Sequence, residues 1–77
     1  MIFKLERGKR YKTTLTLGFL ERLATNEMIA DKFRAAGFTD VVVEGEGGRR
    51  YAEGVWNADD MRADYPPQIS EVTEVVA

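Results

Sequence analysis

The chain opens with two strand-like runs, and in the second of them Tyr11, Leu15 and Leu17 alternate with polar residues, a pattern typical of strands with one buried face. The alternation predicts two strands, over residues 2–6 and 10–17, joined by a turn at Arg7-Gly8-Lys9. Gly8 can adopt the positive φ that such a tight connection requires. The chain is therefore predicted to begin with a β-hairpin.

Beyond this hairpin the apolar spacing becomes that of a helix. Ile29 and Phe33 lie four residues apart and share one face of a helix predicted over residues 26–36. Thr25 or Asn26 can cap its N-terminus, because either side chain can accept a hydrogen bond from a free backbone N–H. This helix is the element that the pattern defines most completely.

Both ends of the helix carry further signals. Leu20 and Leu23 also fit a helical stripe, so an earlier start is an open alternative. Gly37 occupies the position just past the last turn, where a left-handed glycine commonly ends a helix. Phe38 can then fold back onto Phe33, which is the apolar contact that accompanies such a cap.

A second hairpin is predicted after the helix. Residues 41–43 are three valines, too few for a helix, and indicate a strand that is buried on both faces or central in a small sheet. The glycine-rich residues 45–48 form the connection, and residues 49–56 form the return strand. Gly54 inside that strand indicates a bulge or a place where another backbone or a ligand comes close.

The last twenty residues predict one more helix and one more strand. Asn57 and Asp60 resemble a capping box, which favours a short helix over residues 58–63. Tyr65-Pro66-Pro67 ends this helix, because the residue before a proline disfavours the helical conformation. Residues 68–76 are rich in valine and isoleucine and predict a final strand.

The predicted order is ββαββαβ within a single domain that spans residues 1–77. Helices that alternate with strands in so short a chain imply a two-layer α+β sandwich. We therefore expect a mostly antiparallel sheet with two helices on one face. This is a ferredoxin-like βαββαβ arrangement with an extra strand at the N-terminus.

The composition narrows the possible chemistry. The chain is 44% hydrophobic and 31% charged, which is ordinary for a folded domain. It contains neither cysteine nor histidine, so disulfides, thiolate chemistry and the usual zinc ligands are excluded, together with the commonest proton-transfer side chain. We expect no enzymatic activity and no cofactor.

The opening residues also bear on location. Lys4 and Glu6 interrupt the apolar residues at the start, and no stretch of about 20 apolar residues occurs anywhere in the chain. We therefore expect a cytoplasmic protein that does not insert into a membrane.

Charge is distributed unevenly along the chain. Residues 1–12 carry five basic side chains against one acid, whereas residues 40–77 carry nine acids against three arginines. The basic segment could bind an acidic partner or the acidic half of a second copy. Alternatively it protects an edge strand from pairing with other chains, which is the reading we favour. Nucleic acid is an unlikely partner, because the acidic remainder would repel phosphates.

Two motifs with possible ligand chemistry are weak. The glycine-rich residues 45–48 could cradle a phosphate, but such loops lead into a helix, and this one leads into a strand. Asp59, Asp60 and Asp64 could offer oxygens to a divalent cation, yet acids at a predicted helix start more often serve the helix dipole. We therefore expect no metal site.

The strongest candidate for a binding surface is the face of the sheet that the helices leave open. Aromatic side chains beside arginines can stack on sugars, bases or the side chains of a partner. Tyr51 and Trp56 lie five residues apart on one strand and so point to opposite faces, which makes at least one of them a core residue. The candidate ligand-binding or partner-binding residues are Thr14, Thr16, Arg49, Arg50, Tyr51 and Trp56.

The stretch TLTLGFLERLATNEMIADKFRAAGFTDVVV, followed by GRRYAEGVW, resembles the SPOR domain, a module of bacterial cell-division and envelope proteins. The resemblance covers about residues 13–56 and rests on Gly18-Phe19 after a strand, on Ala35 to Phe38 at the helix end and on Tyr51 near the return strand. It implies a βαββαβ sheet with helices on one face. It further implies binding of peptidoglycan glycan strands through the open sheet face.

Two function hypotheses follow. The first is a small non-enzymatic module that binds a protein partner or associates with itself through the open sheet face or an edge strand. The alternative is binding of peptidoglycan glycan strands in the manner of the SPOR family.

Overall fold

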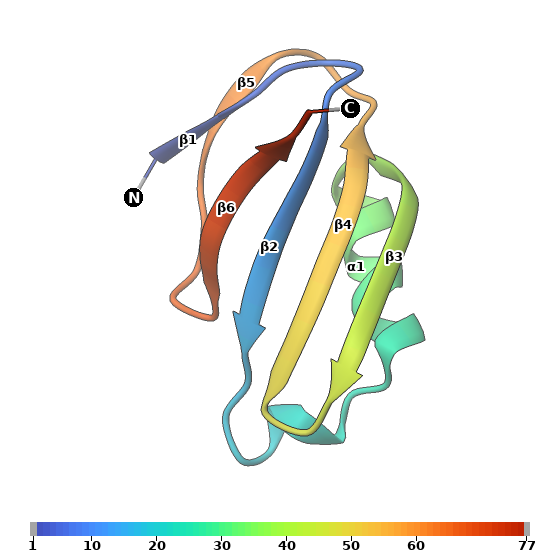
Figure 1. The fold of residues 1–77 in the computed structure, drawn as a ribbon, viewed down its shortest axis with the longest axis vertical. Coiled ribbons are helices and arrows are strands. Elements are labelled where there is room, and N and C mark those ends of the chain that lie inside the picture. Colours follow the sequence, from blue (N-terminus) through green and yellow to red (C-terminus); the bar gives the residue numbers. More distant parts are fainter. Residues whose placement is uncertain (1, 77) are drawn as a thin grey trace.

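The computed structural model describes residues 2–76, which contain one α-helix, one 3₁₀ turn and six strands (Figure 1). The elements in chain order are β1 (Ile2–Leu5), β2 (Arg10–Thr16), η1 (Glu21–Leu23), α1 (Asn26–Ala36), β3 (Phe38–Glu46), β4 (Arg49–Trp56), β5 (Met61–Asp64) and β6 (Ile69–Val75).

Four of the strands form one sheet in the order β3-β4-β2-β6, and every neighbouring pair is antiparallel. Because β4 separates β2 from β3, those two strands run parallel and are joined by η1 and α1, which makes a split βαβ unit. The connection from β4 to β6 crosses in the same way over β2. Its crossover segment is β5 with the loops on either side.

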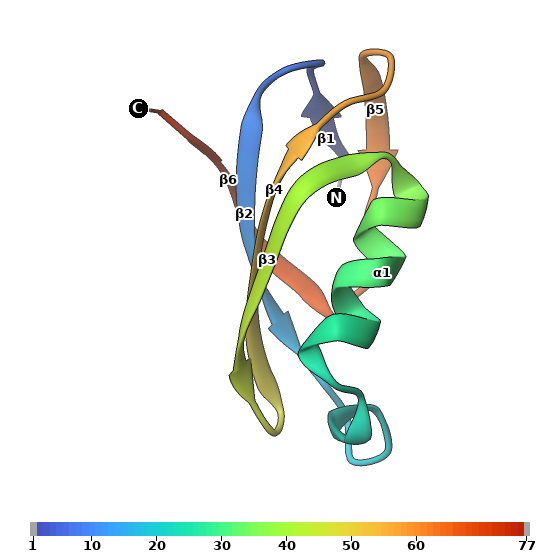
Figure 2. The same cartoon turned by 90° about the vertical axis from the view of Figure 1, so that its right-hand side faces the viewer.

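The two crossovers cover the same face of the sheet. Figure 2 shows α1 and the two-stranded β1–β5 ribbon on one side of the four-stranded sheet, with the ribbon above and the helix below. No helix or strand of residues 2–76 lies on the opposite face. The molecule therefore has a covered face and an open face.

The core on the covered face consists of two separate groups of buried side chains. The upper cluster is Leu5, Tyr11 and Trp56, which ties the β1–β5 ribbon to the sheet. The lower cluster is Leu15, Ile29 and Ala52, against which Phe33, Val43 and Ile69 pack. Each crossover is thus anchored by its own cluster.

The prediction of two helices on one face of the sheet is wrong, because residues 58–63 do not form a helix. Residues Met61–Asp64 form β5 instead, which pairs antiparallel with β1. A helix of only one or two turns is unfavourable, because its few hydrogen bonds do not offset the conformational entropy lost when the first turn forms. Strand pairing satisfies the same backbone groups and also packs Ala63 against the upper cluster.

The predicted N-terminal hairpin is also wrong in its pairing. The strands lie close to the predicted residues, and Gly8 has a positive φ of 88°. However, β1 pairs with β5, while β2 lies inside the sheet between β4 and β6. The turn at Gly8 therefore carries the chain from one layer to the other, and its N–H donates to the carbonyl of Trp56 at 2.8 Å.

The helix prediction is confirmed at both ends. Thr25 accepts a hydrogen bond from the N–H of Met28 at 3.1 Å, which caps the N-terminus. Gly37 ends the helix with φ of 125°, and the rings of Phe33 and Phe38 meet edge to face with centroids 5.7 Å apart. The glycine cap and the Phe33–Phe38 contact that were predicted to end the helix are therefore both present.

The β3–β4 hairpin is confirmed as well, with Glu46 paired to Arg49 across the turn. The prediction that its valines are buried on both faces or central in a small sheet is wrong, because β3 is an edge strand. Val41 and Val43 are half-buried on the covered face, whereas Val42 is exposed on the open face. The reason is that a single layer covers this sheet, so alternate residues of β3 remain in contact with solvent.

Gly37→Ala should lower the free energy of unfolding by about 2–4 kcal/mol, because a Cβ there adds backbone strain and overpacking. That atom would lie 3.1 Å from the Trp56 ring and 3.2 Å from the Cβ of Ala58. Gly8→Ala is the matched control, since Gly8 has φ of 88° and no atom within 4 Å of its added Cβ. It should lose only about 1–2 kcal/mol. Equal losses in urea denaturation would contradict a role for the Trp56 contact.

Candidate functional site: an apolar cleft on the covered face

An apolar cleft of about 690 Å³ lies on the covered face between α1 and the crossover that leads to β6. Its floor includes large residues of both clusters, such as Leu15 and Trp56, and also small ones, namely Thr13, Ala52 and Gly54. Because these side chains are small, they leave space that the clusters on either side do not fill. The volume is within the range of about 300–1,000 Å³ that ligand sites occupy.

The walls of the cleft are apolar on both sides. On the side of α1 they include Ile29, Phe33 and Ala36, which share one flank of the helix. On the opposite side they include Pro66 and Ile69, from the loop before β6 and from β6 itself. A ligand in the cleft would therefore contact the helix and the sheet edge at once.

The rim of the cleft carries polar groups that bond to one another. Gln68 donates a hydrogen bond from Nε2 to Oε2 of Glu21 at 3.2 Å, and exposed Lys32 stands on the helix side. On the floor, the hydroxyl of Thr13 donates to the carbonyl of Ser70 at 2.6 Å. Within residues 2–76 no buried side-chain nitrogen or oxygen lacks a hydrogen-bond partner. The cleft therefore offers apolar contact and no unsatisfied polar anchor.

The size of the cleft has an energetic consequence. At about 24 cal/mol per Å³, a closed empty void of 690 Å³ would cost more than the ~5–15 kcal/mol that holds a domain folded. The cleft instead opens to solvent beside the exposed Lys32 and Met61. Its exposed rim is consequently hydrated in the free protein, and transferring apolar groups from water onto apolar surface there is favourable.

An apolar tip, defined as Phe19, Leu20 and Leu23, lies on the segment that joins β2 to α1, which Figure 2 shows at the lower end of the molecule. These side chains are 81%, 77% and 79% exposed. Exposed apolar side chains of this size that gather in one place usually mark an interaction surface. Sequence reasoning missed the tip, because Leu20 and Leu23 fit the stripe of an early helix start.

Buried Arg50 holds the tip and the start of α1 against the β3–β4 turn. Its guanidinium donates to the carbonyls of Gly47 at 3.1 Å and Arg22 at 3.0 Å, and to Oδ1 of Asn26 at 2.8 Å. The Asn26 amide in turn donates to the carbonyl of Gly45 at 3.0 Å. Arg50 is only 4% exposed, so its charge is compensated by these acceptors.

Four of the six residues predicted from sequence lie on the open face. Thr14 is opposite Tyr51 in the register of β2 and β4, and Thr16 is opposite Arg49. Tyr51 is 49% exposed, and with Thr14 it lines a shallow hollow of about 330 Å³. The other residues that line this hollow include Lys12, Glu53, Glu71 and Thr73.

The other two predicted site residues, Arg50 and Trp56, lie on the covered face, away from this surface. Trp56 is 3% exposed, packs edge to face on Phe38 with centroids 4.9 Å apart, and donates from its indole to the carbonyl of Asp59 at 2.9 Å. The prediction that Tyr51 and Trp56 point to opposite faces is confirmed. Arg50 shares the face of Trp56 because residues six apart on a strand point the same way.

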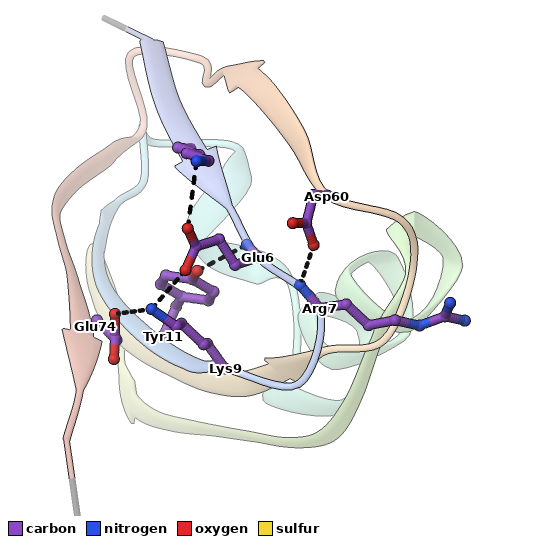
Figure 3. Close-up of polar contacts among 7 residues, drawn as sticks. Glu6, Arg7, Lys9, Tyr11, Asp60 and Glu74 are labelled. Atoms are coloured by element: carbon purple, nitrogen blue, oxygen red, sulfur yellow. Dashed lines mark hydrogen bonds and ion pairs between the residues drawn. The ribbon is translucent and has the colours of Figure 1, made fainter.

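The basic N-terminal segment contacts acids of its own chain, as Figure 3 shows for the residues around the Gly8 turn. Lys9 bridges Glu6 and Glu74, and the backbone N–H of Arg7 donates to Asp60 at 2.7 Å. Hydrogen bonds from Lys9 and then Lys4 lower the pKa of the partly exposed Glu6 carboxyl. The acidic groups that meet this segment therefore come from the same molecule.

The same holds for Arg10, which forms ion pairs with Asp40 of β3 and with Glu53 of β4. The favoured reading, in which the basic residues protect an edge strand, is wrong for β2. That strand is hydrogen-bonded on both sides, and the edges of the four-stranded sheet are β3 and β6. The uneven charge along the sequence is thus largely balanced across neighbouring strands.

The two weaker motifs do not form ligand sites in the described residues. Residues 45–48 make the β3–β4 turn and lead into a strand, without a helix N-terminus for a phosphate. Asp59 and Asp60 contact Arg7, and no group of three acidic side chains in residues 2–76 is placed to hold a metal ion.

Comparison with protein-family models, curated proteins and solved structures finds no match to this chain. Within residues 2–76 no helix is long and apolar enough to cross a membrane. The cleft, the tip and the open face are therefore the features of the molecule from which a function can be inferred.

Arg50→Lys should lower the free energy of unfolding by about 2–4 kcal/mol. The lysine ammonium cannot reproduce the planar guanidinium, which donates to Gly47, Asn26 and Arg22 at once. Amide exchange at Leu23 and Ala24 should accelerate, since the carbonyl of Arg22 loses its donor. Exposed Arg49 provides the control, and Arg49→Lys should change stability by no more than about 0.5 kcal/mol. Similar losses in the two variants would contradict the anchoring role.

Proposed function

We propose that this protein is a non-enzymatic binding module, and that its partner is a protein that inserts an amphipathic helical segment into the apolar cleft. The observation that carries the proposal is the cleft itself, about 690 Å³ of apolar space beside α1 on the covered face. The cleft lies where the connection from β4 to β6 crosses the covered face. That connection consists of β5 and loops and contains no helix.

The chemistry of the cleft supports a protein partner over a small polar molecule. Sites for small molecules combine apolar walls with a few convergent polar groups that orient the ligand. Here the polar groups of the rim and floor already bond to one another, as Gln68 does with Glu21 and Thr13 with Ser70. Apolar side chains at helical spacing need no such anchor.

The extent of the apolar surface supports an elongated partner. Leu17 and Ala24 line the lower end of the cleft, and the apolar tip continues beyond them. A continuous apolar strip from the cleft to the tip fits the i, i+3, i+4 and i+7 anchors of a helix laid along it. The open sheet face presents threonines and paired charges such as Arg10 with Glu53, which favours the cleft as the protein-binding surface.

The groups available for chemistry support a binding role without catalysis. The cleft contains no histidine or cysteine, since the chain has neither. Arg50 is the buried charged side chain of the described residues, and its donors bond to two backbone carbonyls and Asn26. Of the carboxylates that line the cleft, Glu21 already accepts hydrogen bonds from Gly18 and Gln68, and Glu53 accepts one from Arg10.

Helical peptides selected from a display library against this protein should carry apolar residues at i, i+3 or i+4, and i+7. Ala36→Trp should weaken their binding by roughly 10-fold or more, because the indole would occupy the rim of the cleft. Ala35→Trp is the matched control, since Ala35 is also exposed in the last helical turn but does not line the cleft. Fluorescence of Trp56 or an added dye on the peptide measures the affinity. Equal binding by both variants would contradict the cleft as the site.

A second candidate function, glycan binding, is favoured by the placement of Tyr51. Its half-exposed ring lies opposite Thr14 beside a shallow hollow, an arrangement that suits stacking on a sugar ring with hydroxyl groups nearby. This is the surface that the resemblance to the SPOR domain implies. The hollow takes about 330 Å³, enough for a short stretch of glycan to lie across it.

Tyr51→Ala should abolish retention of the protein on purified peptidoglycan sacculi if this second function holds, because stacking would supply most of the contact. Arg49→Ala should reduce retention less, since its side chain lies beside Thr16 at the end of the strand. Phe19→Ala is the control for non-specific apolar adsorption, because Phe19 lies on the tip. Retention that is lost only with Phe19→Ala, or absent in the parent protein, would reject glycan binding.

A further inference from the structure

We propose that the cleft takes a second copy of this chain, whose apolar tip, a short 3₁₀ turn, enters where a longer helical segment of another partner would lie. This inference rests on the proposed function, because it names the occupant of the same cleft. It joins two features of one molecule that remain unexplained separately, an unfilled apolar cleft and a projecting apolar turn.

The tip has the chemistry and the rigidity that an inserting segment requires. Its three side chains are Phe19, Leu20 and Leu23, each more than three-quarters exposed. The turn that carries them is closed by backbone bonds, including the N–H of Arg22 to the carbonyl of Gly18 at 3.0 Å. Arg50 holds the same turn through the Arg22 carbonyl. A preformed turn loses little conformational entropy on binding.

The position of the tip makes a reciprocal contact feasible. Leu17 and Ala24, which flank the tip on either side in the chain, line the lower end of the cleft. The tip and the cleft are therefore neighbours on one surface. A two-fold axis beside the cleft would bring the tip of each copy to the cleft of the other. Such an isologous contact closes after two copies, so it yields a dimer and no filament.

Two side chains of opposite charge at the rim of the cleft are consistent with a two-fold contact. Glu21 lies on the tip turn and Lys32 on α1, and both line the cleft. The Glu21 carboxylate accepts hydrogen bonds from Gly18 N–H and from Gln68, both uncharged donors, so among the described residues its negative charge is not paired with a cation. Lys32 forms no ion pair within residues 2–76, although its neighbours on the helix do. Across a two-fold axis Glu21 of one copy would meet Lys32 of the second, and the reverse pair would form as well. Two equivalent pairs of opposite charge would set the register of the contact.

The area required also favours the reciprocal arrangement. A stable dimer buries about 800 Å² on each copy, and the whole molecule exposes 5279 Å². Three side chains at a tip fall short of that area. In the two-fold contact each copy contributes its tip and its cleft walls, so both apolar surfaces are buried on both molecules.

Sedimentation velocity across a series of concentrations tests the dimer. The parent protein should dimerise reversibly, and Leu20→Asp combined with Leu23→Asp should raise the dissociation constant roughly 100-fold, because two apolar anchors become charged. Both residues are exposed, so circular dichroism should report an unchanged fold. Val76→Asp is the matched control, since Val76 is 80% exposed elsewhere on the chain and its variant should dimerise normally.

Charge reversal tests the arrangement independently. Lys32→Glu alone should weaken dimerisation by about 10-fold, and Glu21→Lys alone should weaken it at least as much. The double variant should recover most of the lost affinity, because the pair then forms with its signs exchanged. Failure of the double variant to recover would overturn the proposed register and with it the two-fold contact.

The outcomes separate this inference from the proposed function. A parent protein that stays monomeric at every concentration, yet binds library peptides in a manner sensitive to Ala36→Trp, overturns the second copy and leaves the cleft as a binding site. A dimer indifferent to both the tip substitutions and Ala36→Trp also overturns the inference. A dimer that Ala36→Trp and the tip substitutions both weaken, and that cleft-binding peptides dissociate, supports it.

Discussion

The sizes of four side chains along one strand set the arrangement of the whole covered face. β4 presents Arg50, Ala52, Gly54 and Trp56 to that face, so large side chains stand at its ends and small ones in its middle. Trp56 supports the β1–β5 ribbon from below, and Arg50 fastens the start of α1 and the tip. Between them β4 itself carries only a methyl group and a hydrogen, so the strand leaves room above its middle. Beside Gly54 the neighbouring strand already comes close, because a Cβ there would lie 3.2 Å from Cγ2 of Val41.

Features that depend on neighbours in the chain could be predicted from the sequence. The helix required only a capping threonine, apolar residues at helical spacing and a glycine followed by Phe38, all within fourteen positions. The β3–β4 hairpin likewise needed two strand-like runs around a glycine-rich turn. In each of these cases the partners of the backbone groups lie a few residues away. Local propensity and the final fold consequently agree.

Features that depend on distant segments could not be predicted. Residues 58–63 carry a helix signal, yet the free edge of β1, almost sixty residues earlier, recruits Met61–Asp64 as a strand. Alternation assigns Arg50 and Tyr51 to opposite faces, but it does not say which face is covered. Burying the arginine and exposing the tyrosine contradicts average preferences. It becomes favourable only because Gly47, Arg22 and Asn26 converge on one guanidinium.

The pairing of β1 with β5 has a consequence for synthesis on the ribosome. The first strand emerges long before Met61–Asp64, so Phe3 and Leu5 have no sheet to join until most of the chain has been translated. At about 5–20 residues per second this delay amounts to several seconds. The segment from α1 to β4, whose contacts are nearer in sequence, can assemble meanwhile. Vectorial folding of this chain is thus ordered from its middle outward, and its opening strand is among the last elements to find a partner.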